Sequence, residues 1–413
     1  MTTSDGRLHA MGPGDYIVEL RRRDARLPFV SMGVSAAGAA PTTVLVPATS
    51  HTHYRLRVHR GAVDIAFDSH EVDWIGLRRA DFRDGWRLIQ RPRVVHRLQM
   101  MIAEGVEFLP LLTAGGAEGR ELAKAMRMLT AWGFGLASRN LQDTAELFAP
   151  CVPDSDMPWR PLAESADRPH FAVVIHLYYL DLWPEFEFYL RRLRQPFHLL
   201  VTTTEADAAL CARIRRVFVD SEVVVLENRG RDIGPFLQLL HEGRLDDYPL
   251  ICKLHGKRTG TSGARALLGN VWRRANVIDL IGTGGQVDRI LERFDRSPHV
   301  GMIGSPRFRV PNEHIQHQVA WGGNEAGTLA LAARLGIPAD LFRLDYFAGT
   351  MFWVRRAVLQ PLKDVGLTLR DFPAENGARD GEIHHACERL FGALPGRVNL
   401  VLDSAPVNFE RPT

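Results

Sequence analysis

The stretch that decides the fold is residues 223–259, VVVLENRGRDIGPFLQLLHEGRLDDYPLICKLHGKRT. Its first apolar run predicts a buried strand, which ends in a polar turn with one glycine and is followed by apolar residues at helical spacing. A second apolar run, 250–252, opens into a cationic segment, 253–258, which we expect to be a turn. Polar turns at the carboxyl ends of neighbouring parallel strands are where open α/β sheets bind ligands, so this stretch predicts a binding site.

Lysine is rare in this chain and is concentrated in that cationic segment. The sequence has four lysines, Lys124, Lys253, Lys257 and Lys363, and every other strong cation is arginine. Lysine is a compact point charge, whereas arginine is a planar fork. A segment that uses lysine instead of arginine favours contact with a phosphate or diphosphate. The alternative is a solvated loop in which two lysines occur by chance.

Length and composition limit the class of protein. A chain of 413 residues predicts two or three domains. A net charge of +3 without a nucleic-acid-binding motif argues against a nucleic-acid partner. The four cysteines have no close pairing and fit a reducing compartment. Because no signal peptide or membrane span is predicted, we expect a cytoplasmic protein. Peripheral contact with anionic lipid at the inner face of the cytoplasmic membrane stays open.

Residues 1–150 are predicted to form a β-rich accessory region with some helix. Short strand-like runs alternate with glycine and proline, as in a small antiparallel sandwich. The run 63–67 follows Arg60-Gly61 and is typical of the return arm of a hairpin. Helical spacing predicts helices over 94–105 and 117–130.

The rest of the chain has a different pattern of predicted secondary structure. Residues 151–169 contain several prolines and predict a linker. From 170 to 413, apolar strand-like runs alternate with helical patterns. Such alternation predicts an α/β domain, a mostly parallel sheet with helices on both faces.

Five motifs of this second region, in order, resemble the rhamnan synthesis protein F family. They are FAVVIHLYYLDL (171–182), ENRGRDIGPFL (227–237), ICKLHGKRT (251–259), FAGTMFWVR (347–355) and DGEIHHACERLFG (380–392). The resemblance covers about residues 169–402. The family is associated with building rhamnose-containing cell-surface polysaccharides, which is the setting that the resemblance implies.

The same order is similar, more distantly, to inverting glycosyltransferases of the GT-A fold. In those enzymes one strand leads to an Asn-x-Gly turn, which Asn228 and Gly230 resemble, and a later strand ends in an Asp-x-Asp metal site. Here Lys253, His255 and Lys257 stand in place of the acidic pair. Mg²⁺ and Mn²⁺ prefer oxygen ligands, which these three side chains do not offer. We therefore expect Lys253, His255 and Lys257 to neutralise the donor diphosphate directly, and we expect that no cofactor is required. The sequence leaves open whether a divalent metal also takes part.

Other residues at the predicted donor site have two interpretations each. Arg229 and Arg231 are phosphate clamps or surface cations. Asp232 contacts the donor or is an acid at a helix start. Asn228 bonds within its own turn, or it binds the donor together with Gly230. The resemblance places His176, at the end of the first strand, beside the nucleotide, and the alternative is that it packs under the next helix.

The resemblance also implies a catalytic acidic segment near residue 380. Inverting transfer needs one base that takes the proton of the acceptor hydroxyl. Asp380 is the first candidate for this base, with Glu375 and Glu382 as further candidates. The alternative for Asp380 is the N-cap of the following helix.

Two histidine motifs invite a metal interpretation. His384 and Glu388 are four residues apart on a predicted helix, and His51 and His53 flank one threonine. Two ligands are too few for a zinc site, so no metal site is predicted.

The resemblances together imply a glycosyltransferase of cell-surface polysaccharide synthesis, of the O-antigen type in lipopolysaccharide. The expected step is rhamnosyl transfer from a nucleotide sugar, dTDP-rhamnose, to a glycan or lipid-linked glycan by inverting displacement. The alternative is a non-catalytic glycan-binding or assembly module, which the missing Asp-x-Asp favours.

Overall fold

The computed structural model describes residues 7–23, 29–36, 42–47, 51–67, 72–84, 100–103, 106–111, 147, 151–155, 157–160, 171–258, 263–311, 320–375, 377 and 380–406. The chain divides into two compact units. One, here the β unit, comprises Met1–Ala149 and Arg258–Val271. The other, the α/β unit, comprises Pro150–Lys257 and Trp272–Thr413.

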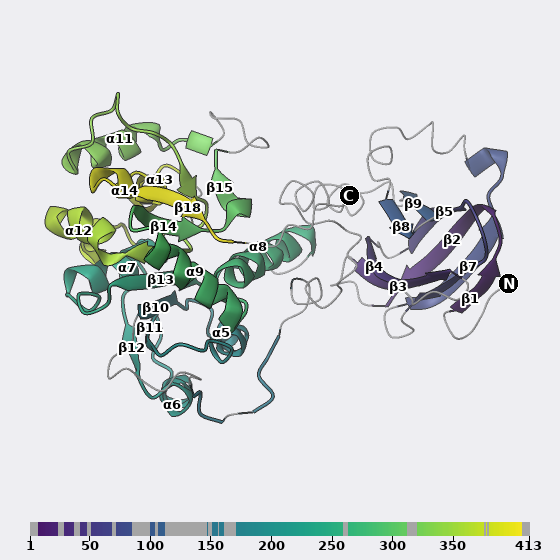
Figure 1. Ribbon diagram of the computed structural model, residues 1–413, viewed down its shortest axis with the longest axis horizontal. Helices are drawn as coiled ribbons and strands as arrows, with labels where there is room; N and C mark the ends of the chain where they lie inside the picture. Colours follow the sequence, from purple (N-terminus) through teal and green to yellow (C-terminus); the bar gives the residue numbers. More distant parts are fainter. Residues whose placement is uncertain are drawn as a thin grey trace. The chain divides into compact units, whose positions relative to one another are not determined.

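The β unit contains two antiparallel sheets (Figure 1). One has the order β1 (Arg7–Met11), β6 (Val63–Phe67), β3 (Phe29–Ala36), β4 (Thr42–Pro47). The other has the order β7 (Val72–Arg79), β2 (Gly14–Arg22), β5 (His51–Val58), β9 (Val106–Leu111), β8 (Met100–Ala103). Apolar side chains of both sheets form one buried cluster, which is the arrangement of the predicted sandwich.

Two sequence predictions for the β unit are wrong. β5 and β6 do not form a hairpin, because β5 pairs with β2 and β9 whereas β6 pairs with β1 and β3. The turn at Gly61 therefore carries the chain from one sheet to the other, and the alternating apolar residues of β6 face the shared core. The predicted helix over 94–105 contains strand β8, which pairs with β9. The predicted helix over 117–130 lies outside the described residues.

The α/β unit is built on a seven-stranded sheet (Figure 1). Its order is β12 (Ser221–Val225), β11 (Phe197–Thr203), β10 (Phe171–His176), β13 (Leu250–His255), β17 (Phe352–Arg355), β14 (Val300–Gly304), β18 (Val401–Ser404). β17 is antiparallel to both neighbours and the other pairings are parallel. The predicted mostly parallel sheet is confirmed.

Helices cover both faces of this sheet. Phe352 and Val354 pack in one cluster with residues of α7, α12 and α13. Trp353, between them, points to the opposite face and donates from Nε1 to the carbonyl of Leu280 in α8, at 3.1 Å. The helices are α5 (Trp183–Leu190), α6 (Ala208–Val217), α7 (Ile233–His241), α8 (Gly263–Ile281), α9 (Gly284–Arg296), α11 (Glu325–Arg334), α12 (Arg356–Val365), α13 (Ile383–Phe391) and α14 (Leu394–Arg397). Short elements are η1 (Leu180–Leu182), η2 (Pro306–Phe308), η3 (Leu369–Asp371) and the paired strands β15 (Arg309–Val310) and β16 (Tyr346–Phe347).

The parallel register gathers polar residues at the carboxyl edge of the sheet. His176 of β10 lies opposite Thr202 of β11 and His255 of β13. β17 runs the other way, so the turn that precedes it reaches the same edge. β13 extends to His255, which corrects the prediction that Lys253 and His255 belong to a turn. The strand continues through a lysine because tertiary contacts satisfy its charge, as shown below.

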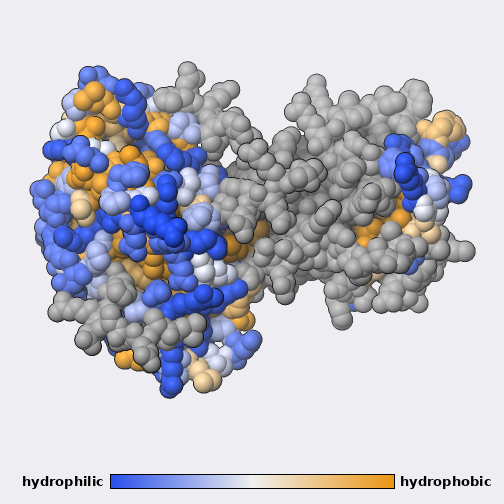
Figure 2. Space-filling view, viewed as in Figure 1, coloured by the Kyte–Doolittle hydropathy of each residue, from blue (hydrophilic) through white to orange (hydrophobic). Residues whose placement is uncertain are grey.

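The surface of the α/β unit is mixed in polarity. Figure 2 shows hydrophilic and hydrophobic residues interspersed over its visible face. Exposed large hydrophobic residues are scattered, for example Tyr178 after β10 and Val219 before β12. Within the described part of the chain, no helix combines the length and the apolar character needed to cross a membrane.

Candidate functional site

Two strained turns lie at the carboxyl edge of the sheet. Gly230 and Arg231 have φ of 64° and 53°, and Gly349 and Thr350 have φ of 85° and 55°. Glycine adopts this left-handed backbone readily, but arginine rarely does, and a β-branched threonine there is an outlier. Such strain persists only where the surroundings hold it and is concentrated at functional sites. The two turns therefore make this edge of the sheet a candidate functional site.

A buried ion pair joins the two turns. Lys253 Nζ donates to Asp232 Oδ2 at 2.5 Å and to the carbonyl and Oγ1 of Thr350, each at 3.0 Å. Thr350 Oγ1 in turn donates to Asp232 Oδ2. An ammonium group has three N–H bonds, so the protein itself uses all of them. With its side chain 1% exposed, Lys253 needs this complete set of partners.

The network also sets the ionisation of Asp232. Burial acts to raise the pKa of this carboxyl group. The charge that His255 carries once it is protonated, the charge of Lys253, and the hydrogen bonds from Lys253 and Thr350 outweigh burial and hold the pKa well below its ordinary range. Asp232 is therefore a permanent carboxylate, and the predicted donor-contacting acid is engaged with a lysine of β13.

Two buried histidines lie beside this ion pair. His255 Nε2 donates to the carbonyl of Gly349 at 2.7 Å, and His176 Nδ1 lies 3.0 Å from Thr202 Oγ1. Burial lowers the pKa of each histidine to about 4. Both rings are consequently neutral at pH 7, so they offer hydrogen bonds rather than positive charge to a ligand.

Lys257 is the exposed cation at this edge. Its Nζ lies 4.4 Å from the ring centroid of Trp272, within cation–π distance. The same indole packs on Gly349, where a Cβ atom would come within 1.7 Å of the ring, so only glycine fits. Trp272 thus holds both the strained turn and the lysine in place.

The predicted donor turn and the predicted catalytic segment lie side by side. Glu375 N donates to the carbonyl of Asn228 at 3.2 Å, and Arg229 forms an isolated β-bridge with Ala374. Arg231 Nε lies 3.2 Å from Glu375 Oε2. These contacts join residues about 145 positions apart, and they place the predicted phosphate clamps next to a candidate base. The roles of these residues stay predictions.

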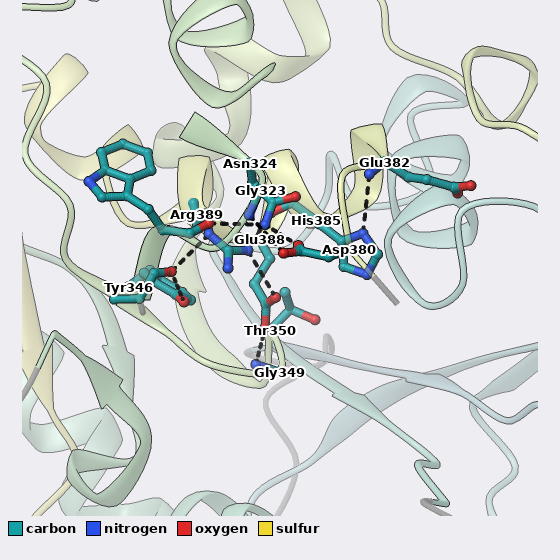
Figure 3. Close-up of polar contacts among 12 residues, drawn as sticks. Gly323, Asn324, Tyr346, Gly349, Thr350, Asp380, Glu382, His385, Glu388 and Arg389 are labelled. Carbon is teal, nitrogen blue, oxygen red and sulfur yellow. Dashed lines mark hydrogen bonds and ion pairs between the residues drawn. The ribbon is translucent and has the colours of Figure 1, made fainter. Parts of the chain in front are cut away.

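Asp380 fastens its segment to the start of α11 (Figure 3). Its Oδ2 accepts from Gly323 N at 2.8 Å, and its Oδ1 accepts from Asn324 Nδ2. Burial acts to raise the pKa of Asp380, but the hydrogen bonds from Gly323, Asn324 and Gly381 lower it. Glu382, not Asp380, is the N-cap of α13, so the capping alternative for Asp380 is wrong.

Glu388 is a site residue that the sequence analysis did not assign. Its carboxylate accepts from the backbone N–H of Gly349, and this contact supports the strained turn (Figure 3). The signal in the sequence was its spacing of four residues from His384, which puts the two side chains on one face of α13. Thr350 was likewise unassigned, and its motif gives no sign of a left-handed backbone.

Two adjacent histidines of α13, His384 and His385, differ in their hydrogen bonding. His384 is 4% exposed, and neither of its ring nitrogens has a hydrogen-bond partner among the described residues. Its ring centroid lies 4.1 Å from that of His385. His385 Nδ1 accepts from Glu382 N and its Nε2 faces Arg231 Nη1, both at 3.3 Å. A neutral ring accepts at one nitrogen only, so His385 can accept from one of these two donors at a time.

Replacing Lys253 by methionine should destabilise the protein by about 3–5 kcal/mol, because a buried carboxylate loses its partner. Adding Asp232→Asn should recover part of that loss, since the uncompensated charge is then gone. Urea unfolding of the two single variants and the double variant measures this. The control is Lys363→Met, whose ammonium group pairs with Asp246 near the surface and should cost at most about 1 kcal/mol. Equal effects of the two lysine variants would contradict the assigned network.

Stability should fall as the pH drops from about 6.5 towards 4. His176 and His255 have folded pKa values of about 4 against an ordinary 6.5, so the unfolded state binds protons first over this window. Each histidine should account for up to about 3 kcal/mol at the acidic end. Urea unfolding at several pH values tests this. His255→Gln, which can still donate to Gly349, should flatten the dependence, whereas substituting the exposed His241 should leave it unchanged.

Comparison with known proteins agrees with the motif-based resemblance. The sequence profile of the family described as "Rhamnan synthesis protein F" matches residues 90–398, beginning well before residue 169. The chain is 32% identical over 226 residues to "Uncharacterized protein WxcX" of Xanthomonas campestris pv. campestris strain B100, and 31% identical to its counterpart in a second strain. The aligned part is 54% of this chain and 31% of each relative, so the chain corresponds to about a third of their length. The chain belongs to the rhamnan synthesis protein F family.

Proposed function

We propose that the α/β unit transfers a sugar residue from a nucleotide sugar during synthesis of a cell-surface polysaccharide. The observation that carries this proposal is the Asp232–Lys253–Thr350 network, which fixes two strained turns at the carboxyl edge of the sheet. A rigid, pre-organised edge of a mostly parallel sheet is suited to holding a nucleotide. Membership of the family supports polysaccharide synthesis as the setting.

We propose that the donor, dTDP-rhamnose, lies along this edge with its diphosphate towards Lys257 and Arg231. Lys257 is exposed and Arg231 ends beside Glu375, so both cations border the edge. His176 and His255 would add hydrogen bonds as neutral rings. Lys253 would act indirectly, because its three N–H bonds already hold Asp232 and Thr350. A fixed ammonium group would then stand where GT-A enzymes use a metal, and transfer would not require a divalent cation.

The proposed reaction is an inverting displacement at the anomeric carbon. The acceptor hydroxyl oxygen forms the new bond, the bond to the diphosphate breaks, and the base takes the hydroxyl proton. We propose Glu375 as this base, because it is accessible and lies 3.2 Å from Arg231 at the donor turn. Both oxygens of Asp380 are engaged by α11, so we propose that Asp380 positions the segment.

The second candidate function is non-catalytic glycan binding or assembly. One observation favours it: no acidic pair is present at the end of β13, where Lys253 and His255 stand instead. A protein of this kind would bind a glycan through the same edge without turning over a nucleotide sugar. Donor binding and turnover therefore separate the two functions.

Nucleotide-sugar binding should raise the melting temperature. At about 100 times its dissociation constant, a donor should stabilise the folded state by about 2.7 kcal/mol. Thermal unfolding with dTDP-, UDP- and GDP-sugars, with and without Mn²⁺, measures this. Lys257→Met should weaken the shift, whereas Lys363→Met should not. No shift with any nucleotide sugar would favour the non-catalytic function. Turnover that is lost in EDTA and restored by Mg²⁺ or Mn²⁺ would contradict metal-free transfer.

Replacing the proposed base should separate turnover from binding. Glu375→Gln should lower the turnover number by about 10²–10⁴ while leaving the donor-induced thermal shift intact. Asp380→Asn should mainly lower the melting temperature, because it weakens the attachment of the segment to α11. A folded Asp380→Asn variant with full stability and no turnover, beside an active Glu375→Gln variant, would assign the base to Asp380 instead.

A further inference from the structure

Three metal-ligating side chains converge on the outer face of the five-stranded sheet in the β unit. His51 Nε2 lies 2.6 Å from Glu19 Oε1, and His53 Nε2 lies 3.0 Å from the same oxygen. The ligand atoms of the three side chains all lie within 4.8 Å of one another. Nothing in the proposed glycosyl transfer uses this cluster.

Strand geometry explains the convergence. β2 and β5 pair antiparallel, and the register places Glu19 directly opposite His53. Side chains two positions apart on a strand share a face, so His51 joins His53. Val18 and Leu20, on either side of Glu19, face the sandwich core, which leaves Glu19 on the outer face. The cluster is therefore fixed by backbone pairing rather than by flexible loops.

The cluster is open to solvent ions. The side chains of Glu19, His51 and His53 are 29%, 50% and 21% exposed. On the other side of β2, the residue opposite Glu19 is Gly76 of β7. Glycine has no side chain, so that neighbour leaves the space above the carboxylate clear. An ion could reach the three ligand atoms without rearrangement of the strands.

The chemistry of the set suits a divalent transition metal. Two imidazole nitrogens and one carboxylate oxygen are a common three-residue set for Zn²⁺, with a fourth position left for water. An imidazole ring binds a metal ion through a nitrogen lone pair, which a neutral ring presents at one of its two nitrogens. In the absence of an ion, a neutral ring can donate its Nε2 proton to Glu19. On binding, that proton moves to Nδ1.

We propose that Glu19, His51 and His53 bind a divalent transition-metal ion, Zn²⁺ fitting best, with one coordination position open. The ion links β2 to β5, which are paired within the five-stranded sheet, and so stabilises the β unit. The His-x-His motif alone offers too few ligands, and Glu19 supplies the third from a strand 32 residues away. The competing explanation is an ion pair between the carboxylate and two histidines, without metal.

The full chain, stripped with EDTA and desalted, should bind one equivalent of Zn²⁺ in a calorimetric titration and should melt at a higher temperature with the metal. Co²⁺ in its place should give the intense visible absorption of a four-coordinate ion. His51→Ala, His53→Ala and Glu19→Gln should each weaken binding by about 10-fold or more, since even an outer-shell partner changes affinity on that scale. His59→Ala is the matched control, because this histidine follows β5 and lies outside the cluster.

Circular dichroism and metal-free melting of each variant check that the fold is retained, as expected for substitutions on an outer face. The proposal is overturned if the wild-type chain binds no Zn²⁺, or if the double variant His51→Ala/His53→Ala binds it with the same stoichiometry and affinity as the wild type. Loss of nucleotide-sugar binding at the α/β unit would not bear on this result, because the titration measures the metal alone.

Discussion

The site depends on one interaction, the hydrogen bonding of the buried ammonium group of Lys253 to Asp232 and Thr350. Removing a charge from water is costly, and only a full set of hydrogen bonds makes the position tolerable. Those partners, Asp232 and Thr350, lie 21 and 97 residues away and belong to the turns before α7 and β17. The hydrogen bonds that satisfy the Lys253 ammonium group therefore hold both of these turns at one edge of the sheet. The left-handed backbone of Thr350 shows that the network outweighs local conformational preference.

A continuous set of polar contacts extends from this ion pair into α13. Arg231, next to Asp232, reaches Glu375 and His385. Glu388 returns from α13 to the backbone of Gly349, at the second strained turn. The turns and the helix are therefore cross-connected by hydrogen bonds within the protein. Pre-organisation of this kind would lower the cost of binding the nucleotide sugar that we propose.

Local sequence predicted the elements whose burial is uniform. β10 is buried throughout and apolar up to His176, which is the pattern expected for a strand covered on both faces. Predictions failed where distant partners decide the outcome. Lys253 was predicted to lie in a turn because charged side chains are usually exposed, yet it lies within β13. Residues 100–103 have helical spacing, yet pairing with β9 makes them a strand.

The sequence by itself determined the fold class, the family and the edge of the sheet where polar motifs gather, because hydrophobic periodicity and motif order are local properties. Only the tertiary structure decided which polar side chains are already engaged. It gave the three N–H bonds of Lys253 acceptors on Asp232 and Thr350, and it left the ring nitrogens of His384 without a hydrogen bond among the described residues. It also brought Glu19 to His51 and His53. Hydrogen-bond satisfaction depends on residues far apart in the chain, and their meeting is set by strand register and packing.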